Sequence, residues 1–186
     1  MIYTPREDSY LLKEILKKYA KNKSVLDMGA GSGILSLAAL EAGAKSVVAV
    51  DINKKAVQHI AAQKINAIES NLFSRVKGKF SIIVCNPPYL PEDSQEDLSS
   101  RKITTGGKRG DEFILRFLAH AKKHVNSRGE ILLLLSSLTP RKRIHALLTK
   151  HKMQKRVIGR KKLFMEQLEV WSIKRTFKKR ATHSAT

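Results

Sequence analysis

The chain has 186 residues and carries 36 Lys and Arg against 16 Asp and Glu, which gives a formal net charge of +20. Its length suits one domain with a full hydrophobic core, and its single cysteine, Cys85, excludes a disulfide framework and a cysteine-rich zinc site. We therefore expect one cytoplasmic domain without a metal, and the apolar runs are too short to span a membrane.

The first half of the chain alternates short apolar runs with segments of helical periodicity. Strands are read from continuous apolar runs, and helices from apolar residues three and four positions apart. The predicted elements are a helix over 6–19, a strand over 24–28, a helix over 34–42, a strand over 46–50, a helix over 54–66 and a very short strand over 67–70. This alternation predicts a parallel sheet that is covered by helices.

The second half continues the alternation and then changes to two consecutive strands. The predicted elements are a strand over 80–85, a helix over 113–125 that is stopped by Gly129, a strand over 130–136, a short helix over 144–148, and strands over 153–158 and 168–174 joined by a basic connection over 159–162. The fold class is therefore α/β. We expect a single Rossmann-like domain over 1–175 with a mostly parallel seven-stranded sheet and an antiparallel C-terminal hairpin, followed by a basic, disordered tail over 176–186.

A glycine-rich turn follows the strand over 24–28, with the pattern Asp27-x-Gly29-x-Gly31-x-Gly33. It lacks the Gly-Lys-Ser/Thr end of a P-loop, and its third glycine comes one residue too early for a dinucleotide site. Glycines at alternate positions let the backbone lie flat against a ligand, and a side chain at Gly31 would enter the ligand's space. We expect Asp27, at the end of the strand, to meet a cationic group such as the ammonium of an amino acid.

Residues at the ends of the next two strands complete a ligand site. Asp51 can accept hydrogen bonds from both hydroxyls of a ribose. Asn71 can hydrogen-bond the edge of an adenine, and Leu72 or Ile52 can pack on its ring. A ligand with a ribose and an amino-acid end, but no phosphate, is S-adenosylmethionine, which we expect as the cofactor.

The strand over 80–85 ends in the tetrapeptide Asn86-Pro87-Pro88-Tyr89. Neither proline has an N–H group, so the ladder cannot continue and the chain leaves the sheet at its carboxyl edge, where open α/β sheets bind their ligands. The amide, the rigid backbone and the aromatic ring can together hold a planar amino group. The tetrapeptide alone also fits a plain loop.

The C-terminal third of the chain is strongly basic. The segment 131–165 contains ten Lys and Arg residues and no carboxylate, and further basic residues follow as far as Arg180. Such a field attracts nucleic acid, a ribonucleoprotein or an acidic protein. The alternative is a solvated face with no partner, because charge speaks to association and not to fold.

In the order of its glycine pattern, Asp51 and Asn-Pro-Pro-Tyr, the chain resembles the class I methyltransferases that modify planar amino groups. Within them it is most similar to the HemK-type protein-glutamine methyltransferases, in the short archaeal and eukaryotic form. The segments 5–12 and 105–110 also match that form, so the resemblance runs over about 3–174. One departure is Asn71, where the family usually has Asp, so that an uncharged amide would make the adenine contact.

The resemblance implies methylation, by S-adenosylmethionine, of the glutamine in the Gly-Gly-Gln loop of a translation release factor. It assigns the Asn86 amide oxygen and the Pro87 carbonyl as acceptors for the target N–H groups, with Pro88 stiffening the turn against the substrate and Tyr89 packing on its planar face. Arg109 could grip the substrate, or its loop could simply lead into the next helix. Relatives also pair the edge of their third strand with a small zinc-binding activator protein. The strand predicted over 67–70 is short, so whether this chain needs such a partner stays open.

Two other functions stay open at this point. The same tetrapeptide could serve an RNA or DNA methyltransferase that acts on an exocyclic amino group of adenine or guanine, a function that the charge favours. A non-enzymatic RNA-binding protein with a vestigial cofactor fold is also possible, but the intact glycines and tetrapeptide argue against it.

Overall fold

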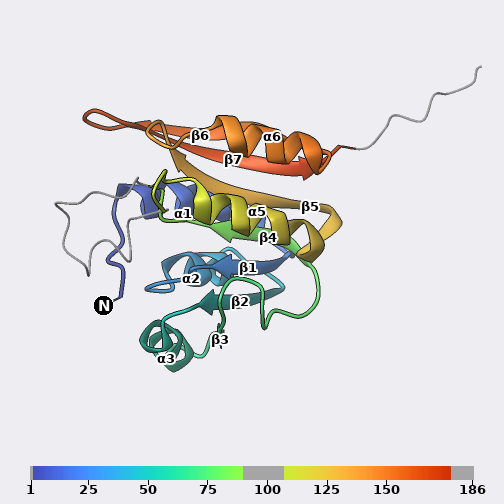
Figure 1. Cartoon of the computed structure of the whole chain (residues 1–186). Helices are drawn as coiled ribbons and strands as arrows, with labels where there is room; N and C mark the ends of the chain where they lie inside the picture. Colours follow the sequence, from blue (N-terminus) through green and yellow to red (C-terminus); the bar gives the residue numbers. More distant parts are fainter. Residues whose placement is uncertain (1, 90–106, 177–186) are drawn as a thin grey trace, which may run out of the picture.

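The computed structural model describes residues 2–89 and 107–176, and its centre is a seven-stranded sheet in the order β3-β2-β1-β4-β5-β7-β6 (Figure 1). The strands are β1 (Ser24–Met28), β2 (Ser46–Asp51), β3 (Asn66–Glu69), β4 (Phe80–Cys85), β5 (Val125–Ser136), β6 (Met153–Lys162) and β7 (Gln167–Arg175). The strands β1 to β5 pair in parallel, whereas β7 runs antiparallel to both β5 and β6. The α/β class and the antiparallel C-terminal hairpin are therefore confirmed.

Helices cover both faces of this sheet (Figure 1). They are α1 (Glu7–Ala20), α2 (Ile34–Glu41), α3 (Lys54–Ala62), α5 (Glu112–His124) and α6 (Lys142–Lys150). Alternate residues of the central strands pack on opposite faces: Leu132 belongs to the core beneath α1, α2 and α3, and Leu133 to the core beneath α5 and α6. Burial on both faces explains why these strands are continuous apolar runs.

The sequence predicts that Gly129 stops a helix, and this prediction is wrong. The helix α5 ends at His124, and β5 begins at Val125, so that Gly129 lies inside the strand. A Cβ on Gly129 would lie 2.8 Å from the carbonyl oxygen of Ser81 in β4. The glycine is therefore required by a close approach of two backbones at an irregular point of the β4–β5 pairing.

Two other boundaries differ from the prediction. The helix α3 ends at Ala62 and not near Asn66, because Lys64 adopts a left-handed conformation (φ 61°) and turns the chain into β3. The segment 159–162 belongs to β6 and does not connect two strands. Gly159 permits this, because a Cβ there would lie 2.1 Å from Cδ1 of Ile15 in α1.

The parallel pairing brings the carboxyl ends of β1, β2 and β4 to one edge of the sheet, which we call the carboxyl edge. Because β7 is antiparallel, its first residues return to the same edge, where Leu168 pairs with Ser136 at the end of β5. At the other end of β7, the Thr176 N–H donates to the Lys152 carbonyl oxygen at 2.8 Å. The predicted tail continues into 177–186, which lie outside the described residues.

Candidate active site

The glycine turn after β1 is held by the end of β2. The N–H groups of Gly29 and Ala30 donate to the carbonyl oxygen of Val50 at 2.8 and 3.0 Å. The three glycines Gly29, Gly31 and Gly33 all have positive φ, between 55° and 81°, which disfavours any other residue at these positions. A Cβ on Gly29 would have no neighbour within 4 Å among the described residues, so the space in front of this residue is open to a ligand.

Gly31 and Gly33 have closer neighbours than Gly29. A Cβ on Gly31 would make an ordinary contact with Cβ of Tyr3 at 3.6 Å, and at Gly33 it would lie 3.0 Å from Cγ1 of Ile60. A side chain at Gly31 would thus lie beside Tyr3 of the N-terminal segment, and the predicted clash with a ligand there stays a prediction. Gly29 is the glycine whose hydrogen atom faces open space.

Asp27 is completely buried, although it lies near the end of its strand. Its Oδ2 accepts a hydrogen bond from the Ser36 hydroxyl at 2.7 Å, while its Oδ1 has no partner among the described residues. Burial raises the pKa of Asp27 to about 7, and the charge of Asp51 adds to this, whereas the Ser36 hydrogen bond opposes it. A donor or cation reaching Oδ1 would satisfy the orphan acceptor and favour the ionised form.

Asp51 clamps the glycine turn to the end of β2. One carboxylate oxygen accepts from the Gly31 N–H and the other from the Asn53 N–H, both at 2.8 Å. Each oxygen keeps lone-pair capacity for a further donor, such as a ribose hydroxyl. Asp51 can therefore accept from a ribose while it keeps this structural role, which the sequence did not indicate.

The three residues predicted for the adenine lie close to Asp51 in the chain or at the end of β2. The Ser70 N–H donates to the Asp51 carbonyl oxygen at 2.9 Å, which brings Asn71 and Leu72 to the end of β2. Asn71 is exposed, Leu72 is half-buried, and Ile52 is 68% exposed. An exposed isoleucine at a ligand-binding edge suits contact with a flat apolar ring.

The Asn86 side chain is fixed by residues of the N-terminal segment. Its Nδ2 donates to Asp8 Oδ2 at 3.1 Å and to Ser9 Oγ at 3.3 Å. The Tyr3 hydroxyl also donates to Asp8 Oδ2, at 2.8 Å, and the Ser9 N–H donates to Asp8 Oδ1 at 2.6 Å. Because an ionised carboxylate can only accept, Asp8 selects the orientation of the amide in which Nδ2 faces it.

This orientation leaves Asn86 Oδ1 free. The atom is buried and has no hydrogen-bond partner in the described part of the chain. An unpaired buried acceptor costs free energy, so it is suited to receive an N–H group of a bound molecule. The amide that the tetrapeptide was expected to present is thus oriented with its acceptor available.

Sequence reasoning missed Tyr3, Asp8 and Ser9 as members of this site. Asp8 precedes Asn86 by 78 residues, and an acidic residue in the first turn of a helix is explained by the helix dipole alone. Their role becomes visible only in the structure, where Asp8 and Ser9 are buried on α1 among its apolar side chains.

Tyr89 packs against both cores at the carboxyl edge. Burial raises the pKa of Tyr89, and the negative charges of Asp8 and Glu166 raise it further. The side chain is therefore a neutral phenol that presents a ring and a hydroxyl. Pro87 is buried and Pro88 half-buried, so the turn between Asn86 and Tyr89 is both rigid and packed.

Arg109 is not brought into contact with the Asn86 turn. Its side chain is exposed, and its N–H donates to both carboxylate oxygens of Glu112 at 3.2 Å. Partial burial opposes ionisation of Glu112, but hydrogen bonds from its own, the Arg109 and the Asp111 backbone N–H groups, with the charge of Arg143, lower its pKa overall. These contacts favour the interpretation that this loop leads into α5.

Residues 2–89 and 107–176 contain neither a metal site nor a membrane-spanning helix. No group of three or more His, Cys, Asp or Glu residues there is arranged to hold a metal ion. None of the helices in these ranges has the length and apolar character needed to cross a membrane.

Comparison with known proteins gives a consistent family. Residues 7–165 match the family model described as "Methyltransferase small domain". A Methanocaldococcus jannaschii protein named as a candidate protein N5-glutamine methyltransferase is 40% identical over 149 residues, which cover 76% of this chain and 75% of that protein. The release factor glutamine methyltransferase of Fusobacterium nucleatum is 38% identical over 110 residues, 52% of this chain and 31% of that protein.

A solved structure with the same fold is that of the E. cuniculi Mtq2-Trm112 complex, described as responsible for methylation of the eRF1 translation termination factor. Its TM-score is 0.77 and its sequence identity 24%, over 94% of this chain and 99% of the matched chain. At this identity the match speaks to fold, and the agreement extends over nearly the whole length of both chains.

Proposed function

Since this chain belongs to the methyltransferase small domain family, we propose that it methylates the side-chain nitrogen of a glutamine in a translation release factor. The cofactor is S-adenosylmethionine, which when bound supplies a methyl group on a cationic sulfur; solved methyltransferases of the same fold hold AdoMet or SAH. The observation that carries the proposal is the orphaned Oδ1 of Asn86, whose amide is oriented by Asp8. A primary amide offers two N–H groups in one plane, and it needs acceptors to hold it.

The residues around the glycine turn fit this cofactor. Asp27 Oδ1 is a buried acceptor without a partner among the described residues, which suits the ammonium of the methionine moiety. The open space at Gly29 lets a ligand approach the backbone, and Asp51 lies at the end of β2, where dinucleotide-binding folds hold a ribose. Asn71, Leu72 and Ile52 would line the adenine end.

The target nitrogen is a weak nucleophile, because its lone pair is delocalised into the carbonyl group. Asn86 Oδ1 and the Pro87 carbonyl would accept its N–H groups, orient the nitrogen and stabilise the positive charge that develops on it. Tyr89 would pack on the planar face of the amide. The methylated nitrogen is acidic enough to lose its extra proton to water, so that no strong general base is required.

The experiment is transfer of a radiolabelled methyl group into purified release factor. We expect label in the wild-type factor and none in a factor whose Gly-Gly-Gln glutamine is replaced by alanine. Equal label in both factors would contradict a glutamine acceptor.

An alternative acceptor is an exocyclic amino group of a nucleic acid. Exposed basic side chains on α6 and on β6, at the edge of the sheet, favour contact with RNA or the ribosome; they include Lys142, Lys150, Lys155, Arg156 and Lys162. Total RNA is therefore offered in parallel, with nuclease and protease controls. Label that nuclease removes and protease leaves would replace the proposed substrate with RNA.

We further propose that a small zinc-binding activator protein pairs with the outer edge of β3. β3 is the terminal strand of the sheet, and the E. cuniculi structure is a complex of two proteins. β-strand addition needs only an open edge, and here the edge is four residues long. Activity that is unchanged by co-expression with such a protein would contradict this partner.

A further inference from the structure

The turn between β6 and β7 exposes two large apolar side chains. Phe164 is 93% and Met165 is 83% exposed, whereas the other exposed large apolar residues among those described are at most 68% exposed. The Leu163 N–H donates to the Glu166 carbonyl oxygen at 2.8 Å, which closes the turn and leaves these two residues at its tip. Met165 is held at φ 62°, a conformation uncommon for any residue but glycine. Neither side chain contributes to the core.

The tip lies at the carboxyl edge, where the candidate active site is (Figure 1). The hydroxyl of Ser136 donates to Glu166, and the charge of Glu166 acts on Tyr89. On the other strand, Lys161 forms an ion pair with Glu7, the residue next to Asp8. Both strands of the turn are thus connected to the elements that hold Asn86 and Tyr89.

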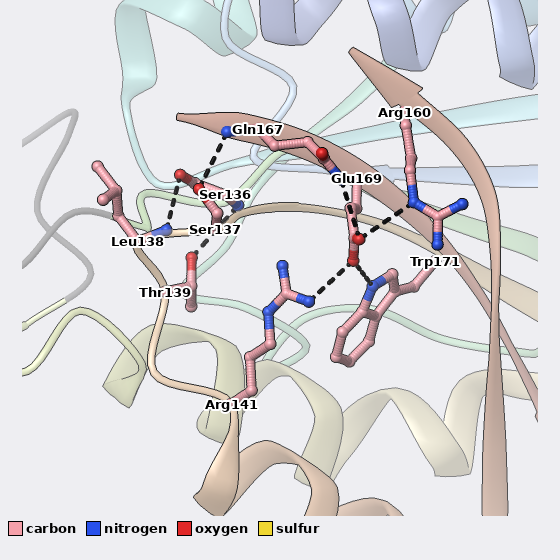
Figure 2. Close-up of polar contacts among 9 residues, drawn as sticks. All are labelled: Ser136, Ser137, Leu138, Thr139, Arg141, Arg160, Gln167, Glu169 and Trp171. Carbon is pink, nitrogen blue, oxygen red and sulfur yellow. Dashed lines mark hydrogen bonds and ion pairs between the residues drawn. The ribbon is translucent and has the colours of Figure 1, made fainter. Parts of the chain in front are cut away.

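The base of this hairpin is rigid. Glu169 is a buried carboxylate that accepts hydrogen bonds from Trp171 Nε1 at 2.9 Å, Arg141 Nη1 at 3.0 Å and Arg160 Nε at 3.3 Å (Figure 2). Arg160 lies directly opposite Glu169 in the β6–β7 pairing, so their contact joins the two strands below the tip. A preorganised projection loses little conformational entropy when it binds a partner.

We propose that Phe164 and Met165 form a docking tip that inserts into an apolar depression on the methyl-acceptor protein, beside its target loop. The inference rests on the proposed function, and it adds a second contact remote from the reacting atoms. Its partner is a protein surface that is apolar at the centre and acidic at the rim, because the exposed Lys162 flanks the tip. A protein uses both tip residues, because phenylalanine and methionine are enriched at the cores of protein interfaces and methionine adapts to irregular apolar surfaces, whereas a stacked base would use the Phe164 ring alone.

The test compares two acceptors, full-length release factor and a short synthetic peptide that contains its Gly-Gly-Gln loop. We expect the Phe164→Ser, Met165→Ser double variant to raise KM for the full-length factor by about 10-fold or more, the scale of losing an interface anchor, with kcat changed by less than about 2-fold. The kinetics of the peptide should not change. A full-length KM that stays at the wild-type value would overturn the docking tip.

The matched control is Leu40→Ser, which removes a 42% exposed leucine from the end of α2, at the opposite edge of the sheet. It should leave both acceptors unaffected, and thermal unfolding should be the same for all variants. A Phe164→Leu single variant should keep KM for the full-length factor close to the wild-type value, since the tip keeps an apolar side chain at this position. An equal rise of KM for the peptide would assign the turn to assembly of the active site and would refute docking.

The wild-type reaction separates the two proposals. Label in release factor, with variants that behave like wild type, refutes the docking tip and leaves the proposed substrate intact. If the wild-type enzyme labels RNA instead, both proposals fail. If it labels a different protein, the proposed substrate is wrong, and the same variants then decide the docking tip on that protein.

Discussion

Asn86 and Asp8 lie 78 residues apart in the chain, yet Nδ2 of the first donates to Oδ2 of the second across 3.1 Å. The contact joins the turn after β4 to the first turn of α1. It also determines which end of the Asn86 amide is free, so the first helix has a part in the chemistry assigned to the tetrapeptide.

Asp8→Asn should lower turnover by about 10- to 100-fold with little effect on cofactor affinity. An asparagine can donate as well as accept, so it no longer imposes one orientation on the Asn86 amide, and misplacement of a positioned acceptor costs rate on this scale. Steady-state kinetics and calorimetric titration of S-adenosylmethionine measure the two effects. A wild-type kcat would show that the amide is oriented without Asp8.

Asn86→Ala should lower kcat by about 100-fold or more, the scale for loss of one transition-state hydrogen-bonding group. Binding of S-adenosylmethionine should stay near the wild-type value, because Asn86 follows β4 and not the glycine turn. Single-turnover methyl transfer at saturating cofactor isolates this effect. Full activity of the variant would refute the assigned acceptor.

Gly29→Ala should weaken cofactor binding by about 10-fold or more, because its Cβ would enter the open space in front of the turn. The matched control is Gly43→Ala, which has a similar φ of 78°, at the end of α2, with only Lys21 Cγ near the new Cβ, at 3.9 Å. Both variants should lose about 1 kcal/mol of stability from backbone strain. Equal cofactor affinity in the two variants would exclude a ligand from the space at Gly29.

Cofactor affinity should rise with pH between about 6 and 8, because Asp27 has a pKa of about 7 and must be ionised to meet a cation. The stability of the free protein should change in the opposite sense. The folded state holds the Asp27 proton more tightly than the unfolded state, so this group's contribution to stability is lost as pH rises from 3.8 to about 7.

Asp27→Asn provides the control for both pH dependences, that of cofactor affinity and that of stability. The variant should bind S-adenosylmethionine weakly at every pH, and its denaturation midpoint should lack the decrease that the wild type shows between pH 4 and 7. A wild-type affinity that does not depend on pH would place the cationic group elsewhere.

Much of the fold could be predicted because the signals were local. The runs at 24–28 and 80–85 are buried on both faces, and their boundaries agree with β1 and β4. The tetrapeptide ends its strand for a reason visible in the sequence, since proline has no N–H group. The glycine turn and Asp51 also lie where parallel pairing requires them.

The errors came from residues whose partners are distant in sequence. Gly129 and Gly159 were interpreted as breaks, but each makes room for another element, β4 in one case and α1 in the other. The same limit applies to Asp8. Its carboxylate faces Asn86 only because α1 packs on one face of the sheet with its first turn at the carboxyl edge, and no local pattern carries that information.

The reversal of β7 brings a hairpin turn to the same edge of the sheet as the candidate active site. The parallel strands β1, β2 and β4 end at the residues proposed for methyl transfer, whereas the reversed strand β7 begins at the same edge, after a turn of its own. A turn at a hairpin end can change in length and composition at small entropic cost while the pairing beneath it is kept. If the docking tip selects the acceptor, substitutions at 163–166 would change acceptor preference without any change in the residues proposed for the reaction.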